Sequence, residues 1–259
     1  MLDIYISPCP NDTYMFHSLC KGIRKMSVPL RFHYLDISEL NQRVLSGVSG
    51  VFKLSFATLF RVEDNYQMLN SGAALGYGCG PLLLKRPGMG NPDPDSLIAI
   101  PGASTTAYAL LKNYYPFIQK TISMRFDEIP KQMMEGKIDY GLVIHETRFV
   151  YKDLGLELVC DLGELFENDT KAPIPLGAIA VHKSLYDFTE ELEQVIRDSI
   201  NDSNEDFPIE FCQKYAQEMD PQVLRNHVKT YVNKFSLDLG RKGLLGVNKL
   251  REYCLRTST

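Results

Sequence analysis

The sequence predicts a two-lobed α/β protein, and three observations support this fold class. Apolar stretches of strand length alternate with amphipathic stretches, which favours parallel sheets covered by helices. The order strand, polar turn, helix occurs both before and after a loop at 86–95, which contains three prolines and two glycines. A length of 259 residues suits one large domain or two lobes. We therefore expect a discontinuous first lobe at 1–85 and 179–259, with an inserted second lobe at 86–178.

The elements of the first unit follow from apolar runs and from residues that begin or end helices. Ser38 is a good cap for a helix, and Gly47 suits the end of that helix. Glycines at 76–80 do not follow the G-x-G-x-x-G spacing, and an apolar run at 81–85 comes next, so a nucleotide site is not indicated. The expected strands are Leu2–Ile6, 30–35 and 51–56, and the expected helices are 14–23 and 39–45.

The second unit repeats this order of elements without a detectable sequence repeat. A turn-rich stretch at 168–175 precedes an apolar run that could carry the chain back to the first lobe. The expected strands are Leu97–Ile100, 140–144 and 177–181. The expected helices are 107–114, 128–136, 188–200, 208–219 and Pro221–Tyr231.

Two polar turns lie at the carboxyl ends of expected strands, which is where ligands bind in open α/β sheets. Each turn has a simpler alternative role, because such residues also cap helices. The hydroxyls and free N–H groups of the second turn would equally suit a carboxylate or a phosphate. The candidate binding residues are Asn11, Asp12 and Thr13 in the first turn, and Ser104, Thr105 and Thr106 in the second.

Three further residues are candidates for the same site. Lys53 and Ser55 alternate with apolar residues on one expected strand, although alternation is also typical of a strand with one solvated face. His145 directly follows the strand at 140–144. An imidazole at that position is suited to proton transfer near neutral pH, and the alternative is a hydrogen-bonded histidine in a turn.

Composition and charge exclude several classes of protein. The net charge of −4 and the absence of a basic stripe argue against nucleic acid as a partner. The six cysteines form no C-x-x-C pair, so neither a zinc site nor a disulfide framework is indicated. The sequence contains no apolar stretch of about 18 residues and no signal-peptide pattern, which predicts a cytoplasmic protein without membrane contact.

Several motifs resemble one enzyme family along nearly the whole chain. They are SPCPNDT at 7–13, KLSF at 53–56, GYGCGPLL at 76–83, PGASTTAY at 101–108, DYGLVIHETRF at 139–149, PLGAIAVHKSL at 175–185 and HVKTYVNKFSLDLG at 227–240. Together they are similar to the 1,4-dihydroxy-6-naphthoate synthases of the futalosine route to menaquinone.

This resemblance implies a fold and a reaction. The fold would be similar to that of type II periplasmic binding proteins, with the ligand in the cleft between the lobes. The substrate would be cyclic dehypoxanthinyl futalosine, a small aromatic carboxylate, and the products 1,4-dihydroxy-6-naphthoate and dihydroxyacetone. No metal or organic cofactor would be needed, and His145 would be the general base. The second polar turn would hold the substrate carboxylate, while Asn11, Asp12 and Ser55 would bind hydroxyls.

Three alternatives remain open on the sequence alone. The first is chorismate dehydratase of the same pathway, against which SPCPNDT and the VIHETRF stretch argue. The second is a non-catalytic binding protein for small carboxylates in transport, which would have no need of a base at His145. The third is a sensor with the same cleft. The C-terminal helices could supply the face of a homodimer.

Overall fold

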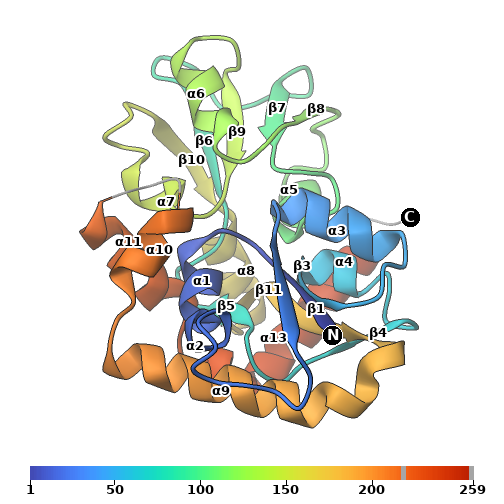
Figure 1. Ribbon diagram of the computed structural model, residues 1–259. Helices are drawn as coiled ribbons and strands as arrows, with labels where there is room; N and C mark the ends of the chain where they lie inside the picture. Colours follow the sequence, from blue (N-terminus) through green and yellow to red (C-terminus); the bar gives the residue numbers. More distant parts are fainter. Residues whose placement is uncertain (217–219, 257–259) are drawn as a thin grey trace.

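Two mixed sheets form the centres of two lobes in the computed structural model, which describes residues 1–216 and 220–256 (Figure 1). The first sheet has the order β2-β1-β3-β11-β4, and β5 also pairs with β11. Its strands are β1 (Leu2–Ile6), β2 (Leu30–Tyr34), β3 (Val51–Ser55), β4 (Tyr66–Met68), β5 (Ala74–Gly76) and β11 (Ile174–His182). The second sheet has the order β10-β6-β9-β7-β8. Its strands are β6 (Leu82–Lys85), β7 (Leu97–Ile100), β8 (Lys120–Ser123), β9 (Tyr140–Val143) and β10 (Glu157–Asp161).

The two sheets share one arrangement of strands. β1 pairs in parallel with β2 and β3, and β7 pairs in parallel with β8 and β9. An antiparallel strand then follows in each sheet, β11 beside β3 and β6 beside β9. The expectation of parallel sheets is therefore correct for three neighbouring strands of each sheet, whereas β11 and β6 run opposite to the strands they pair with. Polar residues follow the carboxyl ends of β1, β7 and β9, and Ser55 is the last residue of β3.

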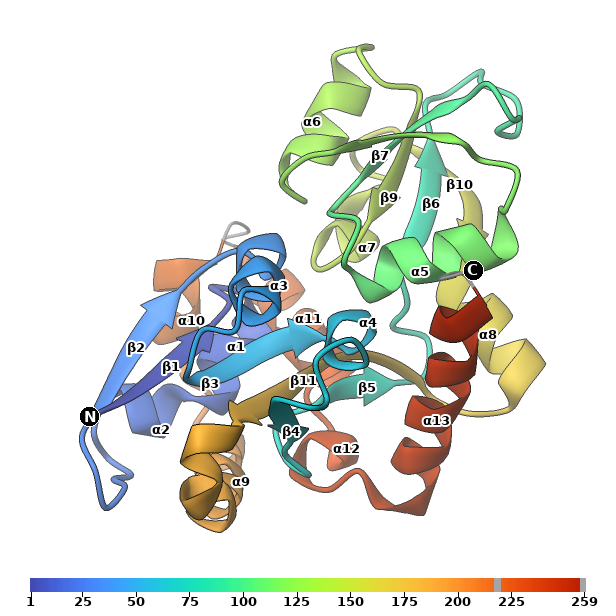
Figure 2. The same ribbon diagram turned by 90° about the vertical axis from the view of Figure 1, so that its right-hand side faces the viewer.

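Helices cover both sheets, and the C-terminal helix touches both lobes. α13 packs against β11 and α4 of the first lobe and against α5 of the second (Figure 2). The helices are α1 (Pro10–Met15), α2 (His17–Cys20), α3 (Ile37–Leu45), α4 (Phe56–Leu59), α5 (Thr106–Tyr114), α6 (Glu128–Met134), α7 (Thr147–Val150), α8 (Leu162–Thr170), α9 (Thr189–Glu205), α10 (Ile209–Tyr215), α11 (Pro221–Tyr231), α12 (Lys234–Leu237) and α13 (Gly240–Arg256), with a 3₁₀ helix at Lys183–Phe188. Within the described residues, every helix is too short or too polar to cross a membrane.

Several expected boundaries are wrong, and local chemistry explains two of them. The first helix begins at Pro10 and not at residue 14, because proline is favoured in the first helical turn, where its missing N–H is not needed. Asp36, not Ser38, caps α3, and its carboxylate accepts a hydrogen bond from Ser38 N. The turn-rich stretch expected at 168–175 is shorter in the structure, since α8 ends at Thr170 and β11 begins at Ile174.

Other elements lie outside the expected set. The sequence does not predict β4, β5, β8, β10, α4, α7, α8, α12 or α13. The helix expected at 208–219 ends at Tyr215, and its last three positions, 217–219, lie outside the described residues.

The predicted lobe boundaries at 85/86 and 178/179 remain a prediction, but strand pairing divides the chain at different positions. β6, at Leu82–Lys85, pairs with strands of the second sheet, although it precedes residue 86. β11 joins the first sheet from Ile174 onward. The chain therefore crosses between the sheets just after β5 and just before β11.

One apolar core joins the two lobes. The largest cluster of buried apolar side chains includes Phe52 and Leu54 of β3 together with Leu83 of β6 and Ile98 of β7. Leu110 of α5 belongs to the same cluster. Because this burial removes apolar surface of both lobes from water, the lobes are packed against each other around the space between them.

Gly80 lies where the chain first passes from one sheet to the other, between β5 and β6, and its backbone closely contacts Gly163. A Cβ atom on Gly163 would lie 2.6 Å from Cα and 2.8 Å from N of Gly80, whose backbone cannot move aside cheaply. We expect Gly163→Ala to lower the free energy of unfolding by about 1–3 kcal/mol or more, measured by urea denaturation. Gly90→Ala is the control, because that glycine has open space around it and should stay within about 0.5 kcal/mol of wild type. Equal effects of the two substitutions would contradict the packing argument.

Candidate active site

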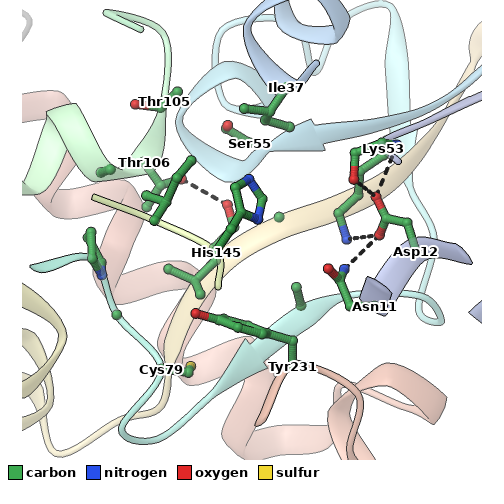
Figure 3. A pocket seen from close by; sticks show the side chains of 18 residues that line it. Asn11, Asp12, Ile37, Lys53, Ser55, Cys79, Thr105, Thr106, His145 and Tyr231 are labelled. Atoms are coloured by element: carbon green, nitrogen blue, oxygen red, sulfur yellow. Dashed lines mark hydrogen bonds and ion pairs between the residues drawn. The ribbon is translucent and has the colours of Figure 1, made fainter. Parts of the chain in front are cut away.

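A cavity between the two sheets collects most of the polar residues that follow the parallel strands (Figure 3). Both lobes contribute to its walls, and apolar residues fill the space between the polar groups. The lining residues are Ser7, Asn11, Asp12, Ile37, Lys53, Ser55, Ala74, Cys79, Gly80, Pro81, Thr105, Thr106, Ala107, Ile144, His145, Leu176, Gly177 and Tyr231. The strand ends that the sequence singles out therefore meet in one place.

A buried ion pair forms the first-lobe wall of the cavity. Lys53 Nζ lies 3.0 Å from Asp12 Oδ1, and both side chains are almost completely buried. Asp12 Oδ2 accepts a hydrogen bond of 2.6 Å from the Ser7 hydroxyl, and Asn11 Nδ2 donates to Asp12 Oδ1 over 2.8 Å. The hydrogen bonds to both Asp12 oxygens offset the removal of this carboxylate from water, whereas the Lys53 ammonium has the ion pair with Asp12 as its compensation. The first polar turn is thus a rigid network rather than a solvated loop.

The network continues from Asn11 to a histidine of the C-terminal region. His227 Nε2 lies 3.0 Å from Asn11 Oδ1, so this ring nitrogen carries the proton and donates it to the amide oxygen. His227 Nδ1 lies 3.7 Å from Glu146 Oε2. Burial, and then the charges of His145 and Lys53, hold the pKa of His227 well below its usual value. His227 therefore connects the first polar turn to the residue that follows His145.

His145 is held in an unusual backbone conformation at the end of β9. Its φ is 59°, in the left-handed region that few residues other than glycine adopt. Its Nδ1 atom lies 3.4 Å from Cys9 Sγ, and the ring packs edge-on against Phe126 at 4.6 Å between centroids. Burial lowers the pKa of His145 to about 4; the Asp12 carboxylate partly opposes this shift, and the Lys53 ammonium adds to it. The imidazole is thus neutral near pH 7 and able to accept a proton.

The low pKa of His145 predicts a pH-dependent stability. An unfolded histidine has a pKa near 6.5, so between about pH 6.5 and pH 4 the unfolded chain binds a proton that the folded chain does not. The stability that neutral His145 contributes is therefore lost as the pH falls through this range. Between about pH 7 and pH 5, wild type should lose on the order of 2 kcal/mol more than His145→Asn.

The measurement is urea denaturation of both proteins across this pH range in a buffer with a chelator. Asparagine suits the comparison because it does not titrate and tolerates the left-handed conformation better than most residues. Other titratable groups are common to both proteins. Parallel curves of stability against pH for the two proteins would rule out a depressed pKa at this position.

The second polar turn supplies a helix N-terminus. Thr105 caps α5: its hydroxyl donates to Gly102 O over 2.7 Å and accepts from Tyr108 N over 3.2 Å. The Thr106 hydroxyl donates to Leu176 O over 3.1 Å. Thr106 and Ala107 are the first residues of the helix, where backbone N–H groups have no partner within the helix. This end of α5 lines the cavity and suits an anionic group.

The remaining candidates differ in their relation to the cavity. Ser55 lines it, and its hydroxyl accepts a 3.0 Å hydrogen bond from Asn41 Nδ2, which leaves the hydroxyl proton available to a ligand. Thr13 does not line it, because its hydroxyl donates to the carbonyls of Cys9 and Pro10 within α1. Ser104 lines a different pocket, which residues of α4, α5 and α13 also line. The substrate-binding roles expected for these residues remain predictions.

Several residues at the site are not predicted by the sequence. Cys9, Glu146 and His227 lie next to His145 or to the Asn11 network. Only their membership in the quoted motifs could have indicated them, since contacts between residues so far apart in the chain leave no local spacing pattern. The chemical result is a neutral imidazole, a buried ammonium and a helix N-terminus around one cavity. Burial also raises the pKa of Tyr231, so its phenol is a neutral hydrogen-bond donor in the same wall.

Comparisons with known proteins agree with the resemblance in the motifs. The chain is 38% identical over 253 residues to a 1,4-dihydroxy-6-naphthoate synthase of Thermus thermophilus, covering 96% of this chain and 92% of that protein. It is 37% identical over 260 residues to a protein of the same name from Streptomyces coelicolor, covering 96% and 91%. Both matches extend over both lobes.

Solved structures confirm the predicted fold class, and a family model identifies the family. A crystal structure of an Archaeoglobus fulgidus protein has a TM-score of 0.92 at 28% identity, covering 99% of this chain and 97% of that one. A Candida albicans protein described as having the generic periplasmic binding protein fold has a TM-score of 0.68 at 11% identity, covering 99% and 94%. The family model described as menaquinone biosynthesis matches residues 2–256. The chain therefore belongs to the menaquinone biosynthesis family.

Proposed function

We propose that this chain is a carbon–carbon lyase that converts cyclic dehypoxanthinyl futalosine to 1,4-dihydroxy-6-naphthoate and dihydroxyacetone. The observation that carries the proposal is the half-buried, neutral imidazole of His145 in a cavity with polar groups from both lobes. Support also comes from the names of the Thermus and Streptomyces relatives, which are 37–38% identical over nearly the whole chain.

His145 acts as the general base in this proposal. It removes a proton from the cyclic substrate, which starts cleavage of the carbon–carbon bond, and aromatisation of the second ring supplies much of the driving force. A general base works best when its pKa lies near the working pH, and the pKa of about 4 refers to the cavity without a bound anion. A substrate carboxylate nearby would raise the pKa of His145 toward that range, because a negative charge stabilises imidazolium.

The substrate is held between groups of the two lobes. Its carboxylate binds at the N-terminus of α5, where the N–H groups of Thr106 and Ala107 lack helical partners. Its hydroxyls bind to the Ser55 hydroxyl and to the Asn11–Asp12 network on the opposite wall. Lys53 neutralises Asp12, so this wall can approach an anionic substrate without repelling it. The packed lobes exclude water around the reacting atoms.

Turnover of the purified chain tests the proposal. The protein is incubated with cyclic dehypoxanthinyl futalosine in a metal-free buffer, and the products are identified by mass spectrometry. We expect 1,4-dihydroxy-6-naphthoate and dihydroxyacetone in equal amounts. A parallel incubation with chorismate measures the alternative dehydratase reaction. Dehydration of chorismate without naphthoate formation would replace the proposed reaction, and tight binding of the futalosine without any product would favour a binding protein.

A further inference from the structure

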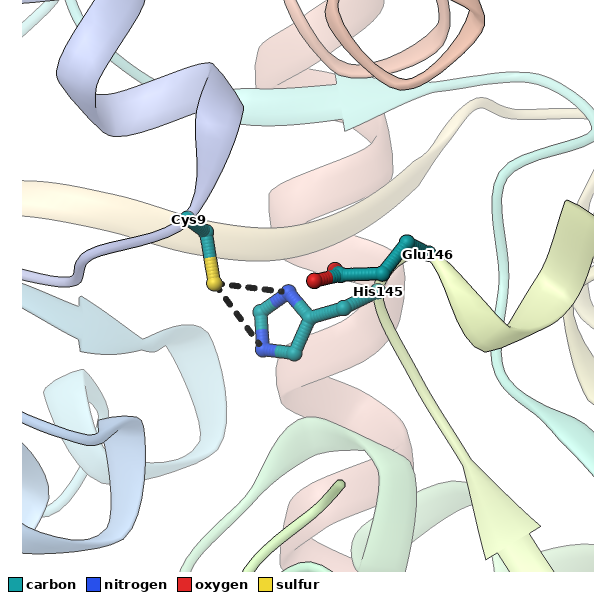
Figure 4. A group of neighbouring side chains, drawn as sticks. All are labelled: Cys9, His145 and Glu146. Carbon is teal, nitrogen blue, oxygen red and sulfur yellow. Dashed lines mark hydrogen bonds between the residues drawn. The ribbon is translucent and has the colours of Figure 1, made fainter. Parts of the chain in front are cut away.

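Three metal-ligating side chains from the two lobes meet beside the cavity (Figure 4). Cys9 comes from the turn after β1, and His145 and Glu146 follow β9 of the other sheet. One ligand atom from each residue, a thiol sulfur, an imidazole nitrogen and a carboxylate oxygen, lies within 4.8 Å of the others. We propose that these three residues bind a Zn²⁺ ion that bridges the two lobes and blocks the base.

The Cys9 side chain does not cap α1, although Cys9 stands at the capping position. Cys9 is the N-cap residue of α1, where Ser, Thr, Asp or Asn normally bonds to the helix, but it makes no side-chain capping bond. Its sulfur lies 3.4 Å from His145 Nδ1 and 3.8 Å from His145 Nε2. Cys9 is 3% exposed, so the thiol is held toward the other lobe rather than toward solvent.

The donor set favours zinc over harder cations. Zn²⁺ binds sulfur at about 2.3 Å and nitrogen or oxygen at about 2.0–2.2 Å, so neighbouring ligand atoms in a tetrahedral site lie about 3.3–3.7 Å apart. The 3.4 Å between Cys9 and His145 already fits, and the largest separation in the cluster needs a contraction of about 1 Å. Mg²⁺ and Ca²⁺ prefer oxygen ligands only. The fourth position would face the cavity and take a water molecule.

Local charges also favour a cation here. The Glu146 carboxylate lies within 4.8 Å of the Cys9 sulfur. A carboxylate that opposes a thiolate attracts a dication at the same place. Coordination replaces the thiol proton, which passes to the buffer. The bound Cys9 thiolate and the Glu146 carboxylate then balance the two charges of the ion. The Lys53 ammonium in the cavity wall would oppose the ion, but Asp12 pairs with it at 3.0 Å.

The ion would act as an inhibitor and not as a cofactor. His145 cannot accept a substrate proton through a nitrogen that coordinates the metal. The ion also ties the first-lobe turn to the second lobe, which hinders any opening that admits a substrate. The sequence predicts no zinc site because Cys9 and His145 are far apart in the chain and show no ligand spacing. The inhibitory effect rests on the proposed function, whereas binding of the ion does not.

Cobalt substitution tests binding without any turnover. The full chain is freed of metal with a chelator, desalted and titrated with Co²⁺, which reports a thiolate ligand by a near-ultraviolet charge-transfer band. We expect the band to saturate at one Co²⁺ per chain and to disappear when Zn²⁺ is added. Cys9→Ala should lack the band, and Glu146→Gln should weaken Zn²⁺ binding by at least about 10-fold. Absence of the band in wild type overturns the proposal.

Cys79 provides the matched control, because it is also a buried cysteine in the wall of the cavity. Cys79→Ala should keep the charge-transfer band. Loss of the band in Cys79→Ala, or persistence of the band in Cys9→Ala, would overturn the assignment of Cys9 as the thiolate ligand. Cys9→Ser retains the size of the side chain and replaces Cys9→Ala if that variant does not fold. In the turnover assay, Zn²⁺ should inhibit wild type reversibly and inhibit Cys9→Ala far less. Lack of turnover in metal-free wild type would count against the proposed function and leave the cobalt result unaffected.

Discussion

Replacing His145 with alanine or asparagine is expected to lower kcat for the futalosine substrate by about 10²–10⁴, the usual effect of losing a general base. The physical reason is that neither side chain can accept the substrate proton at the end of β9. Asparagine is the sharper substitution, because it tolerates the φ of 59° at this position and preserves the backbone. Steady-state formation of 1,4-dihydroxy-6-naphthoate measures the effect.

The matched control for the base is His182→Ala. His182 lies at the end of β11, and its Nδ1 bonds to the exposed Ser184 hydroxyl at 2.8 Å. It does not line the cavity, so kcat should remain close to wild type. If His145→Asn retained wild-type turnover, another group would have to remove the proton. A large rise in KM with unchanged kcat would instead make His145 a binding residue.

Replacing Lys53 with methionine is expected to lower the free energy of unfolding by about 3–5 kcal/mol. Methionine keeps most of the side-chain volume but removes the ammonium 3.0 Å from Asp12 Oδ1. The Asp12 carboxylate, which has no exposed surface, would then be left with only its hydrogen bonds to Ser7 and Asn11. Urea denaturation at pH 7 in a buffer with a chelator measures the loss.

Two further proteins separate the buried charge from other causes. The double variant Asp12→Asn with Lys53→Met removes both charges, and it should recover a large part of the loss. Lys120→Met breaks an exposed ion pair with Asp95 and should change stability by at most about 1 kcal/mol. If Lys53→Met were as mild as Lys120→Met, the pair would not be important for folding.

Much of the fold can be predicted because the two lobes repeat one simple pattern. β1, β3, β7 and β9 are short, mostly apolar runs with polar residues at or just after their carboxyl ends, and parallel strands bring such ends to the same edge of a sheet. This is why Asp12, Ser55, Thr105 and His145 are found by position alone. Short or polar strands are harder to predict, because β4 and β5 have three residues each and β8 has the sequence KTIS, which is too polar for a clear period.

The parts of the site that escape prediction depend on contacts across the fold. His227 bonds to Asn11 over a separation of 216 positions, and Cys9 meets His145 over 136. Neither pair leaves a spacing pattern, since only tertiary packing brings the residues together. Thr13 shows the opposite case. It belongs to the predicted polar turn, but because α1 begins at Pro10 its hydroxyl is used by the helix backbone.

The late position of β11 has a consequence for how the protein is made. All strands of the second sheet lie between Leu82 and Asp161, so the ribosome delivers them before the first sheet receives its central strand. β11 then separates β3 from β4, and α11 with His227 emerges later still. Because domains fold as units during synthesis, the inserted lobe is expected to form first. A nascent chain would thus carry His145 long before it has the surroundings that hold the imidazole neutral.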